Sequence, residues 1–211
     1  MVIAMFFLAI FFALNMGGAS FAASFAAPYG SRLIDRKKAG LLFTLFVVLG
    51  SVLLGKNVSV TLGKNLIDLN LITPQMVIVI FFSAGLSMFV SNIMKIPQST
   101  SLVTVASIAG VGAYYGKLNL GTILYLVPFW ILLPVLSYLF THVITGYIYP
   151  PRKRNFWVYE RLINHQDKLK NLVIVMSCYN AFAVGANNVA NVVGPLLGAF
   201  ALLGLLFVFA S

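Results

Sequence analysis

The sequence predicts an all-α integral membrane protein that contains two inverted repeats. Three observations support this fold class. The composition is 61% hydrophobic and 9% charged, with only four acidic residues among 211, which leaves too little polarity for a water-exposed surface. Apolar runs near the roughly 20 residues needed to cross a bilayer recur along the chain. A motif late in the chain also has a degraded copy near its start, as in chains with internal repeats.

The candidate spans are bounded by charge clusters or by Gly, Pro and Asn breaks. They cover residues 2–28, 39–55, 74–95, 97–116, 121–149 and 171–211. By the positive-inside rule, the basic loops 31–38 and 152–170 should be cytoplasmic, and the nearly balanced loop 56–73 should face outward. The N-terminus then lies outside if 97–116 crosses. If 97–116 is a re-entrant hairpin instead, the number of crossings must change elsewhere in the chain to keep both basic loops cytoplasmic. The chain is therefore expected to be a multi-pass protein of the plasma or inner membrane.

The repeated motif places polar groups at membrane depth. Its later copy, residues 185–195, reads GANNVANVVGP, and its earlier copy, residues 18–28, reads GASFAASFAAP. The predicted topology brings the earlier copy in from outside and the later copy in from the cytoplasm, so the copies are inverted. Buried polar groups in a membrane are costly and mark a functional site. We predict a first repeat at 1–170, including the loop 151–170, and the start of a second repeat at 171–211.

A third polar segment, PQSTS at residues 97–101, has the pattern of a helix start. Proline favours the first turn of a helix, and the hydroxyls beyond it lie where backbone N–H groups are still unpaired. Such a helix end attracts anions because it adds a partial positive charge to these donors. The alternative is a Pro-bounded loop whose hydroxyls only cap the next helix.

These motifs resemble those of the inorganic phosphate transporter (PiT) family. Its signature, G-A-N-D-x-A-N-x-x-G-P, occurs in each of two inverted halves and is followed in each by P-x-S-T-[ST]. Residues 185–195 match every specified position except the acidic one, which is Asn188, and residues 97–101 match the second motif. The first copy departs further, with Ser for both Asn and Phe21 for the Asp. The resemblance implies an inverted-repeat secondary transporter, with broken or re-entrant helices, that binds a tetrahedral oxyanion.

The predicted substrate-binding residues are the polar side chains of the three segments, which supply hydrogen-bond donors without a fixed charge. They are Ser20, Ser24, Ser99, Thr100, Ser101, Asn187, Asn188 and Asn191. We expect Ser99, Thr100, Asn187 and Asn191 to converge on one site. No catalytic or metal-binding residue is predicted.

The two lost signature acids bear on the substrate. In the sodium-coupled phosphate carriers of the family, those carboxylates look like ligands for a hard cation. Phe21 and Asn188 supply no such charge, and the altered signature looks more like the sulfate-permease branch than the phosphate branch. We therefore favour sulfate slightly over inorganic phosphate. The coupling ion of such a symporter, proton or sodium, stays open, and no other cofactor is expected.

Other classes of protein fit the sequence less well. A non-transporting scaffold subunit or an anion channel are the alternatives that remain. An enzyme is not expected, because two His, four acids and one Cys cannot form an activated cluster. The basic clusters lack interleaved aromatics, so anionic membrane lipids are expected partners and nucleic acid is not.

The length of the repeat raises a further expectation. The two copies start 167 residues apart, at 18 and 185, so a complete second repeat would extend well past residue 211. Either the sequence is part of a longer reading frame, which we favour, or another copy of the chain supplies the missing half through oligomerisation.

Overall fold

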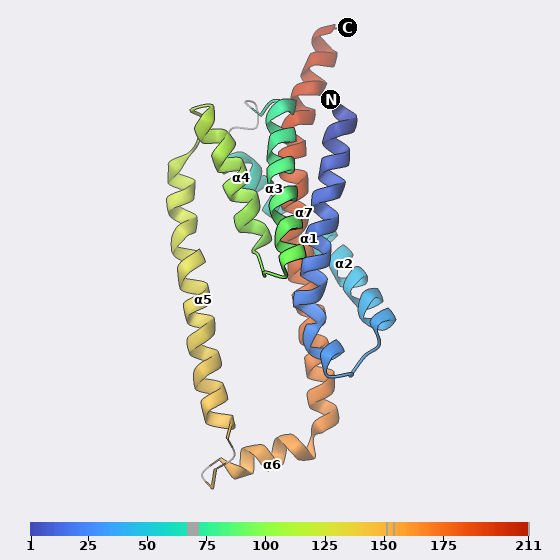
Figure 1. The fold of residues 1–211 in the computed structure, drawn as a ribbon, viewed down its shortest axis with the longest axis vertical. Helices are drawn as coiled ribbons and strands as arrows, with labels where there is room; N and C mark the ends of the chain where they lie inside the picture. The colour runs from blue at the N-terminus through green and yellow to red at the C-terminus, as the bar shows by residue number, and fades with distance from the viewer. Residues whose placement is uncertain (67–71, 151, 154, 211) are drawn as a thin grey trace. The chain divides into compact units, whose positions relative to one another are not determined.

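A computed structural model describes residues 1–66, 72–150, 152–153 and 155–210, with the backbone alone for 56–66, 197–198 and 200–210. The described residues form helices and no strand (Figure 1). The helices are α1 (Val2–Gly30), α2 (Arg36–Leu66), α3 (Pro74–Met94), α4 (Thr100–Tyr114), α5 (Leu120–Ile148), α6 (Phe156–Asn164) and α7 (Gln166–Ala210). Five of these described helices are long and apolar enough to cross a membrane. The prediction of an all-α, multi-pass membrane protein is confirmed.

Two predicted loops are partly helical. α2 continues to Leu66, into the predicted loop 56–73, because no Pro interrupts the chain before Pro74 and a Gly only weakens a helix. Residues 67–71 of that loop lie outside the described residues. The predicted loop 152–170 contains α6 and the start of α7. α6 forms there because its apolar residues recur every three or four positions, which gives an amphipathic helix.

The chain folds as two compact units, residues 1–119 with 177–211, and residues 120–176. The first unit contains α1 to α4 and most of α7, and it holds every predicted binding residue. In the second unit none of the residues of α5 is buried, and Asn155 ties the end of α5 to the start of α6 by donating to the Tyr147 carbonyl at 2.7 Å. The predicted boundary at residue 170 separates two sequence repeats and not two compact units, so it stays a prediction.

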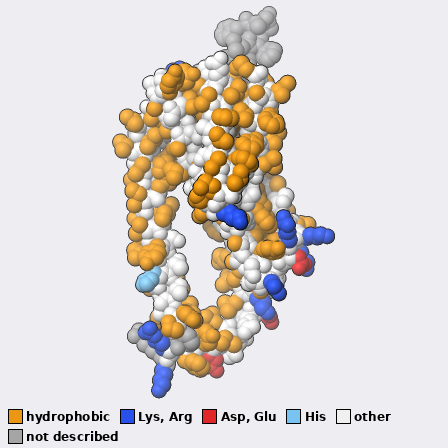
Figure 2. Space-filling view, viewed as in Figure 1, with side chains coloured by type: hydrophobic (Ala, Val, Ile, Leu, Met, Phe, Trp, Pro, Cys, Tyr) orange, Lys and Arg blue, Asp and Glu red, His pale blue; other side chains and the backbone are white. Residues whose placement is uncertain are grey.

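The core of the first unit lies between α1 and α3. Both helices bury an apolar residue at about every third or fourth position, so that one face of each is covered by the other. The rings of Phe12 and Phe81 lie 6.2 Å apart in this contact. Gly85 allows the close approach, since a Cβ there would lie 2.9 Å from the Phe11 ring. Hydrophobic side chains cover much of the outer surface of the molecule, as expected for helices that face lipid (Figure 2).

α3 and α4 form a helical hairpin whose tip lies against the middle of α1. The Lys95 backbone ends α3 in the left-handed region, with φ 58°, and the Ser99 hydroxyl caps α4 by accepting from the Leu102 N–H at 3.3 Å. Near the tip, Asn92 donates to the Asn15 carbonyl at 3.0 Å, and Asn15 is close to the midpoint of the 29-residue α1. α4 has 15 residues, or about 22 Å, which is short of the roughly 30 Å hydrocarbon core.

This geometry indicates a re-entrant hairpin. α3 and α4 run antiparallel and meet at a tip beside the middle of α1, although α3, with 21 residues, is long enough to cross a bilayer by itself. The hairpin favours the re-entrant alternative for 97–116, with residues 74–95 as its other arm. In this alternative both arms of the hairpin begin and end on one side, so the two predicted crossings are lost together and the predicted sides of the other loops stay the same. Lys95 then lies at the tip of the hairpin and not in a cytoplasmic loop.

The two signature copies lie side by side and antiparallel. Met16, Ser20 and Ser24 of α1 contact Asn191, Asn188 and Asn180 of α7, respectively, so numbers that rise along α1 fall along α7. This order confirms the inverted arrangement of the two copies. Both copies lie within continuous helices. The break in helical structure therefore occurs at the hairpin tip and not in the signatures.

Candidate functional site

Asn188 links three helices at the centre of the first unit. Its Oδ1 accepts from the Thr100 hydroxyl at 3.0 Å, and its Nδ2 donates to the Ser20 hydroxyl at 2.8 Å. Ser20 comes from α1, Thr100 from the first turn of α4 and Asn188 from α7. The two signature copies and the hairpin tip thus meet at one amide, with hydroxyls on both sides. We call this set, Ser20, Thr100 and Asn188, the Asn188 network.

A second link joins α7 to the same end of α4. Asn187 Nδ2 donates to the Ser101 hydroxyl at 2.6 Å. Because Ser101 directly follows Thr100, the first turn of α4 is held by two consecutive amides of the second signature. The start of α4 also presents backbone N–H groups that have no partner within the helix. Hydroxyls, amides and a helix N-terminus therefore converge at this point.

Asn191 occupies the most buried position of the predicted set. Its side chain is fully buried, its Nδ2 lies 3.8 Å from the Met16 sulfur, and its Oδ1 has no hydrogen-bond partner among the described residues. An unsatisfied buried carbonyl costs about 1–3 kcal/mol. One turn further along α1 from Ser20, the Ser24 hydroxyl accepts from Asn180 at 3.3 Å. Asn191 and Ser24 thus flank the Asn188 network along the interface between α1 and α7.

Ser99 differs from the other predicted residues. Its side chain is exposed, and its hydroxyl is turned to the start of its own helix. Of the four residues expected to converge, Thr100 and Asn187 lie together at the start of α4, and Asn191 lies deeper between α1 and α7. The structure gives Ser99 a capping position. Whether any of these residues binds substrate stays a prediction.

The position of the first signature acid is occupied by an aromatic cluster. Phe21 lies 6.0 Å from Phe25 and 5.3 Å from Phe43 of α2, measured between ring centroids. Its side chain therefore packs toward α2, whereas its counterpart in the second copy, Asn188, faces the hairpin. Ser20 makes the polar contact on α1 in its place.

Two residues that support the site were not predicted. The Ser51 hydroxyl of α2 lies 2.7 Å from the Val47 carbonyl of its own helix and 3.1 Å from the Gly185 carbonyl, where the second signature begins, so the two acceptors share its one proton. Gly50 beside it allows this contact, because a Cβ there would lie 2.0 Å from the Phe182 carbonyl oxygen. The signal in the sequence was the pairing of small residues, 50–51 in α2 with 185–186 in α7, which lets helix backbones approach closely.

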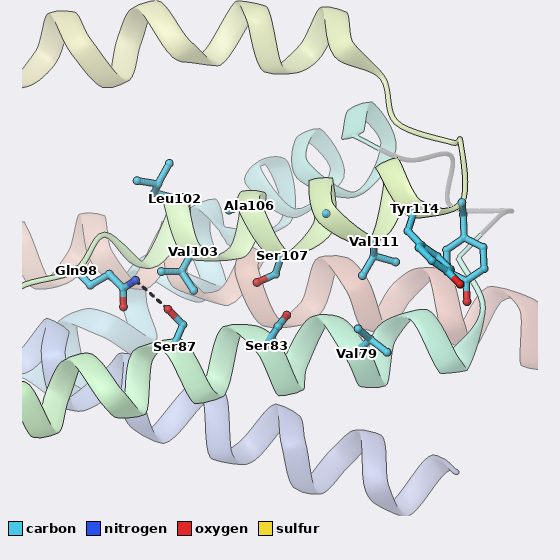
Figure 3. A pocket seen from close by; sticks show the side chains of 12 residues that line it. Val79, Ser83, Ser87, Gln98, Leu102, Val103, Ala106, Ser107, Val111 and Tyr114 are labelled. Atoms are coloured by element: carbon cyan, nitrogen blue, oxygen red, sulfur yellow. Dashed lines mark hydrogen bonds between the residues drawn. The ribbon is translucent and has the colours of Figure 1, made fainter.

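Gln98 organises the hairpin on its other face. It donates to the Ser87 hydroxyl at 3.0 Å (Figure 3) and accepts from the Ser91 hydroxyl at 2.7 Å, so two of the three serines of α3 are held by the turn. A cavity of about 690 Å³ opens beside this contact, between α3 and α4, and Ser83 and Ser107 add hydroxyls to its wall (Figure 3). The cavity contains none of the eight predicted binding residues.

The fold and the site together define a class. Antiparallel signature helices, a re-entrant hairpin that ends between them and a charge-free set of donors at the meeting point are the features of an inverted-repeat secondary transporter. The family model described as the phosphate transporter family matches residues 16–205. The chain therefore belongs to the phosphate transporter family.

Individual relatives agree with this assignment. The chain is 36% identical over 191 residues to the sulfate permease CysP of Bacillus subtilis, which covers 90% of the chain and 52% of that protein. It is 27% identical over 186 residues to the sodium-dependent phosphate transporter 1 of Felis catus, across 83% of the chain and 26% of that protein. The chain thus spans about half the length of the first relative and about a quarter of the second.

A solved structure shares the fold. The structure titled "The sodium-dependent phosphate transporter" superposes with a TM-score of 0.78 at 21% identity, over 96% of this chain and 68% of that one. The inverted-repeat fold predicted from the motifs is thereby confirmed. The family and these relatives are named as transporters and not as enzymes, in agreement with the expectation from the sequence.

Proposed function

We propose that the protein to which this chain belongs is a secondary transporter that carries an inorganic oxyanion, with sulfate favoured over phosphate. The observation that carries the proposal is the Asn188 network, in which the hairpin tip meets both signature copies through uncharged donors. A desolvated oxyanion needs several donors from different elements, and hydroxyls, amides and the N-terminus of α4 supply them. The predicted binding residues, from Ser20 to Asn191, are proposed to bind the substrate together.

The choice of sulfate rests on charge. Sulfate is a dianion at neutral pH and has no proton to donate, so a carboxylate nearby repels it without accepting a hydrogen bond. Two unit charges 4 Å apart interact by about 4 kcal/mol at an effective dielectric constant of 20, and a dianion doubles this. Asn188 removes that repulsion from the second signature copy, and Phe21 removes it from the first. The identity with a protein named as a sulfate permease supports the same choice.

We further propose that the rate of transport depends little on sodium. A hard cation prefers oxygen ligands and a negative charge, and neither signature position offers a carboxylate. The amide oxygens of Asn188 and Asn191 are neutral alternatives, and the Asn191 oxygen is buried without a partner among the described residues. A weak sodium requirement follows from this donor set, and its hydroxyls and amides offer no group that would carry a coupled proton.

Uptake by proteoliposomes of the full-length protein tests the proposal. We expect labelled sulfate to enter, excess phosphate to compete weakly, and a sodium gradient to change the rate little. Thr100→Ala should reduce uptake at least tenfold while the protein stays in the membrane, and Ser107→Ala, on the same helix but outside the Asn188 network, is the matched control. Sodium-driven phosphate uptake that excess sulfate leaves unchanged would overturn the choice of substrate but not the family.

Asn188→Asp tests the same reasoning in reverse. The new carboxylate should weaken sulfate uptake and raise the sensitivity to phosphate or sodium. The alternatives from the sequence have their own outcomes in these assays. A scaffold subunit shows no anion-dependent uptake, and a channel shows uptake without counterflow, because only alternating access accumulates labelled anion against internal unlabelled anion.

A further inference from the structure

Lys95 is a cation at the tip of the re-entrant hairpin. It ends α3 with a left-handed backbone, and its side chain is exposed. The described residues give it no ion pair, since the salt bridges there join Lys38 to Asp35 and Lys170 to Asp167. A charged group inside a membrane protein is costly unless it meets water, an opposite charge or a substrate. Lys95 should therefore face water, an opposite charge or a substrate.

A cavity of about 530 Å³ lies around Lys95. Its wall is formed by one face of the first signature copy, where Gly18, Ala19, Ala22 and Ala23 carry almost no side chain, and by the hairpin tip from Ser91 to Gln98. The tip reaches from this cavity to the Asn188 network, because Thr100 follows Gln98 by two residues. Ala22 lies eight residues before Gly30, where α1 ends, so the cavity is about 12 Å from that end of the helix.

Two further cavities continue from this one toward the end of α1. A cavity of about 490 Å³ shares Ala22 with the first and extends to Tyr29 and Arg36. A third, of about 500 Å³, shares Tyr29 and Arg36 and adds Arg32 from the basic loop 31–38. Neighbouring cavities share lining residues, so the three follow one another along α1, and we call this row of cavities the α1 track. Lys95 lines its first cavity, and Arg32, Arg36 and the carboxylate of Asp35 line its last.

We propose that this track conducts the inorganic oxyanion between the Asn188 network and the cytoplasmic side, with Lys95 as an intermediate binding residue. The proposal rests on the proposed function, and it adds a binding residue, Lys95, that belongs neither to the signature copies nor to the motif at 97–101. A lysine suits this position because its ammonium is a hydrated point charge on a flexible stem, which attracts a dianion without holding it in a fixed geometry. The small residues of the first signature copy leave the space that a hydrated anion needs.

Cysteine reactivity tests the charge of the track without requiring transport. Ala22→Cys, in a background from which Cys178 and any other cysteine of the full-length protein have been removed, places a single thiol between two neighbouring cavities. From the cytoplasmic side, an anionic sulfonatoethyl thiosulfonate should react faster than the cationic trimethylammonium analogue. Lys95→Gln should reduce this rate ratio by roughly tenfold, because the charge raises one rate and lowers the other. Lys117→Gln, which removes a cation between α4 and α5, is the matched control and should leave the ratio unchanged.

Sided transport tests the binding role. In reconstituted full-length protein, Lys95→Gln should raise the half-saturating sulfate concentration severalfold at the cytoplasmic face and leave the external value unchanged, while Lys95→Arg should retain the native value. Lys95→Gly, which accepts the left-handed backbone, should match Lys95→Gln if the charge and not the fold is responsible. An unchanged rate ratio together with an unchanged cytoplasmic affinity overturns the track, even if sulfate uptake itself stands. Absence of uptake in the native protein, with the rate ratio as expected, would instead overturn the proposed function and keep the cationic track.

Discussion

Gly50→Ala should separate α2 from the second signature helix. A Cβ at position 50 would lie 2.0 Å from the Phe182 carbonyl oxygen, whereas ordinary contact begins at 3.4 Å. The helices must therefore move apart by 3.4 − 2.0, or about 1.4 Å, and neither atom can rotate away because both belong to backbone or its first carbon. Overpacking of this kind costs typically 1–3 kcal/mol. The movement also lengthens the contact of Ser51 with the Gly185 carbonyl, and the Ser51 proton then stays on the Val47 carbonyl of its own helix.

Thermal unfolding of the purified full-length protein in detergent measures this cost. A loss of about 3 kcal/mol corresponds to a fall in apparent Tm of roughly 6–12 °C for a chain of this size. The control is Gly40→Ala in the same helix, where nothing lies within 4 Å of the added methyl group. Uptake should fall in the first variant and not in the second, since a 1 Å misplacement can cost on the order of 100-fold in rate. Equal Tm values for the two variants would refute the close helix crossing.

Three other predictions address topology, the buried amide and the hairpin. Cysteines placed at Asp35 and Glu160 should be labelled from the same, cytoplasmic, side, and labelling from opposite sides would contradict the inverted topology. Asn191→Ala should abolish most uptake while the protein stays in the membrane, and full uptake would make this amide structural. Asn92→Ala removes the bond to the Asn15 carbonyl, about 1 kcal/mol, so hydrogen exchange near residues 95–99 should speed up severalfold, and unchanged exchange would show that other contacts hold the tip.

The membrane class and the inverted copies could be predicted from the sequence because each depends on local composition. Apolar runs and charge clusters are properties of single segments, and the signature match is a property of eleven consecutive residues. The hairpin was harder to predict, because its depth depends on the Asn92 contact with Asn15, which joins residues 77 positions apart. The length of α4 was the available signal, since Pro97 shortens the apolar run to 15 helical residues.

The site likewise combines features that local sequence predicts with features that depend on long-range contacts. The residue types that meet at Asn188 were predicted from the motifs, but their pairing was not. Ser99 and Thr100 are adjacent and chemically alike, yet the N-cap position turns the Ser99 hydroxyl to its own helix and leaves that of Thr100 to reach α7. Ser51 has no motif at all. Its role arises from a helix crossing that only the tertiary structure creates.

Asn188 changes the chemistry of the site as well as its charge. An amide accepts at oxygen and donates at nitrogen, and Asn188 uses both atoms, one toward Thr100 and the other toward Ser20. A carboxylate could only accept, so the Ser20 hydroxyl would have to turn its proton toward it, and the added negative charge would require a cation in the same packed space. Among the described residues no Lys, Arg or His hydrogen-bonds to this network. The amide thus joins three helices without a counter-ion, which is what the proposed binding of an inorganic anion at this site requires.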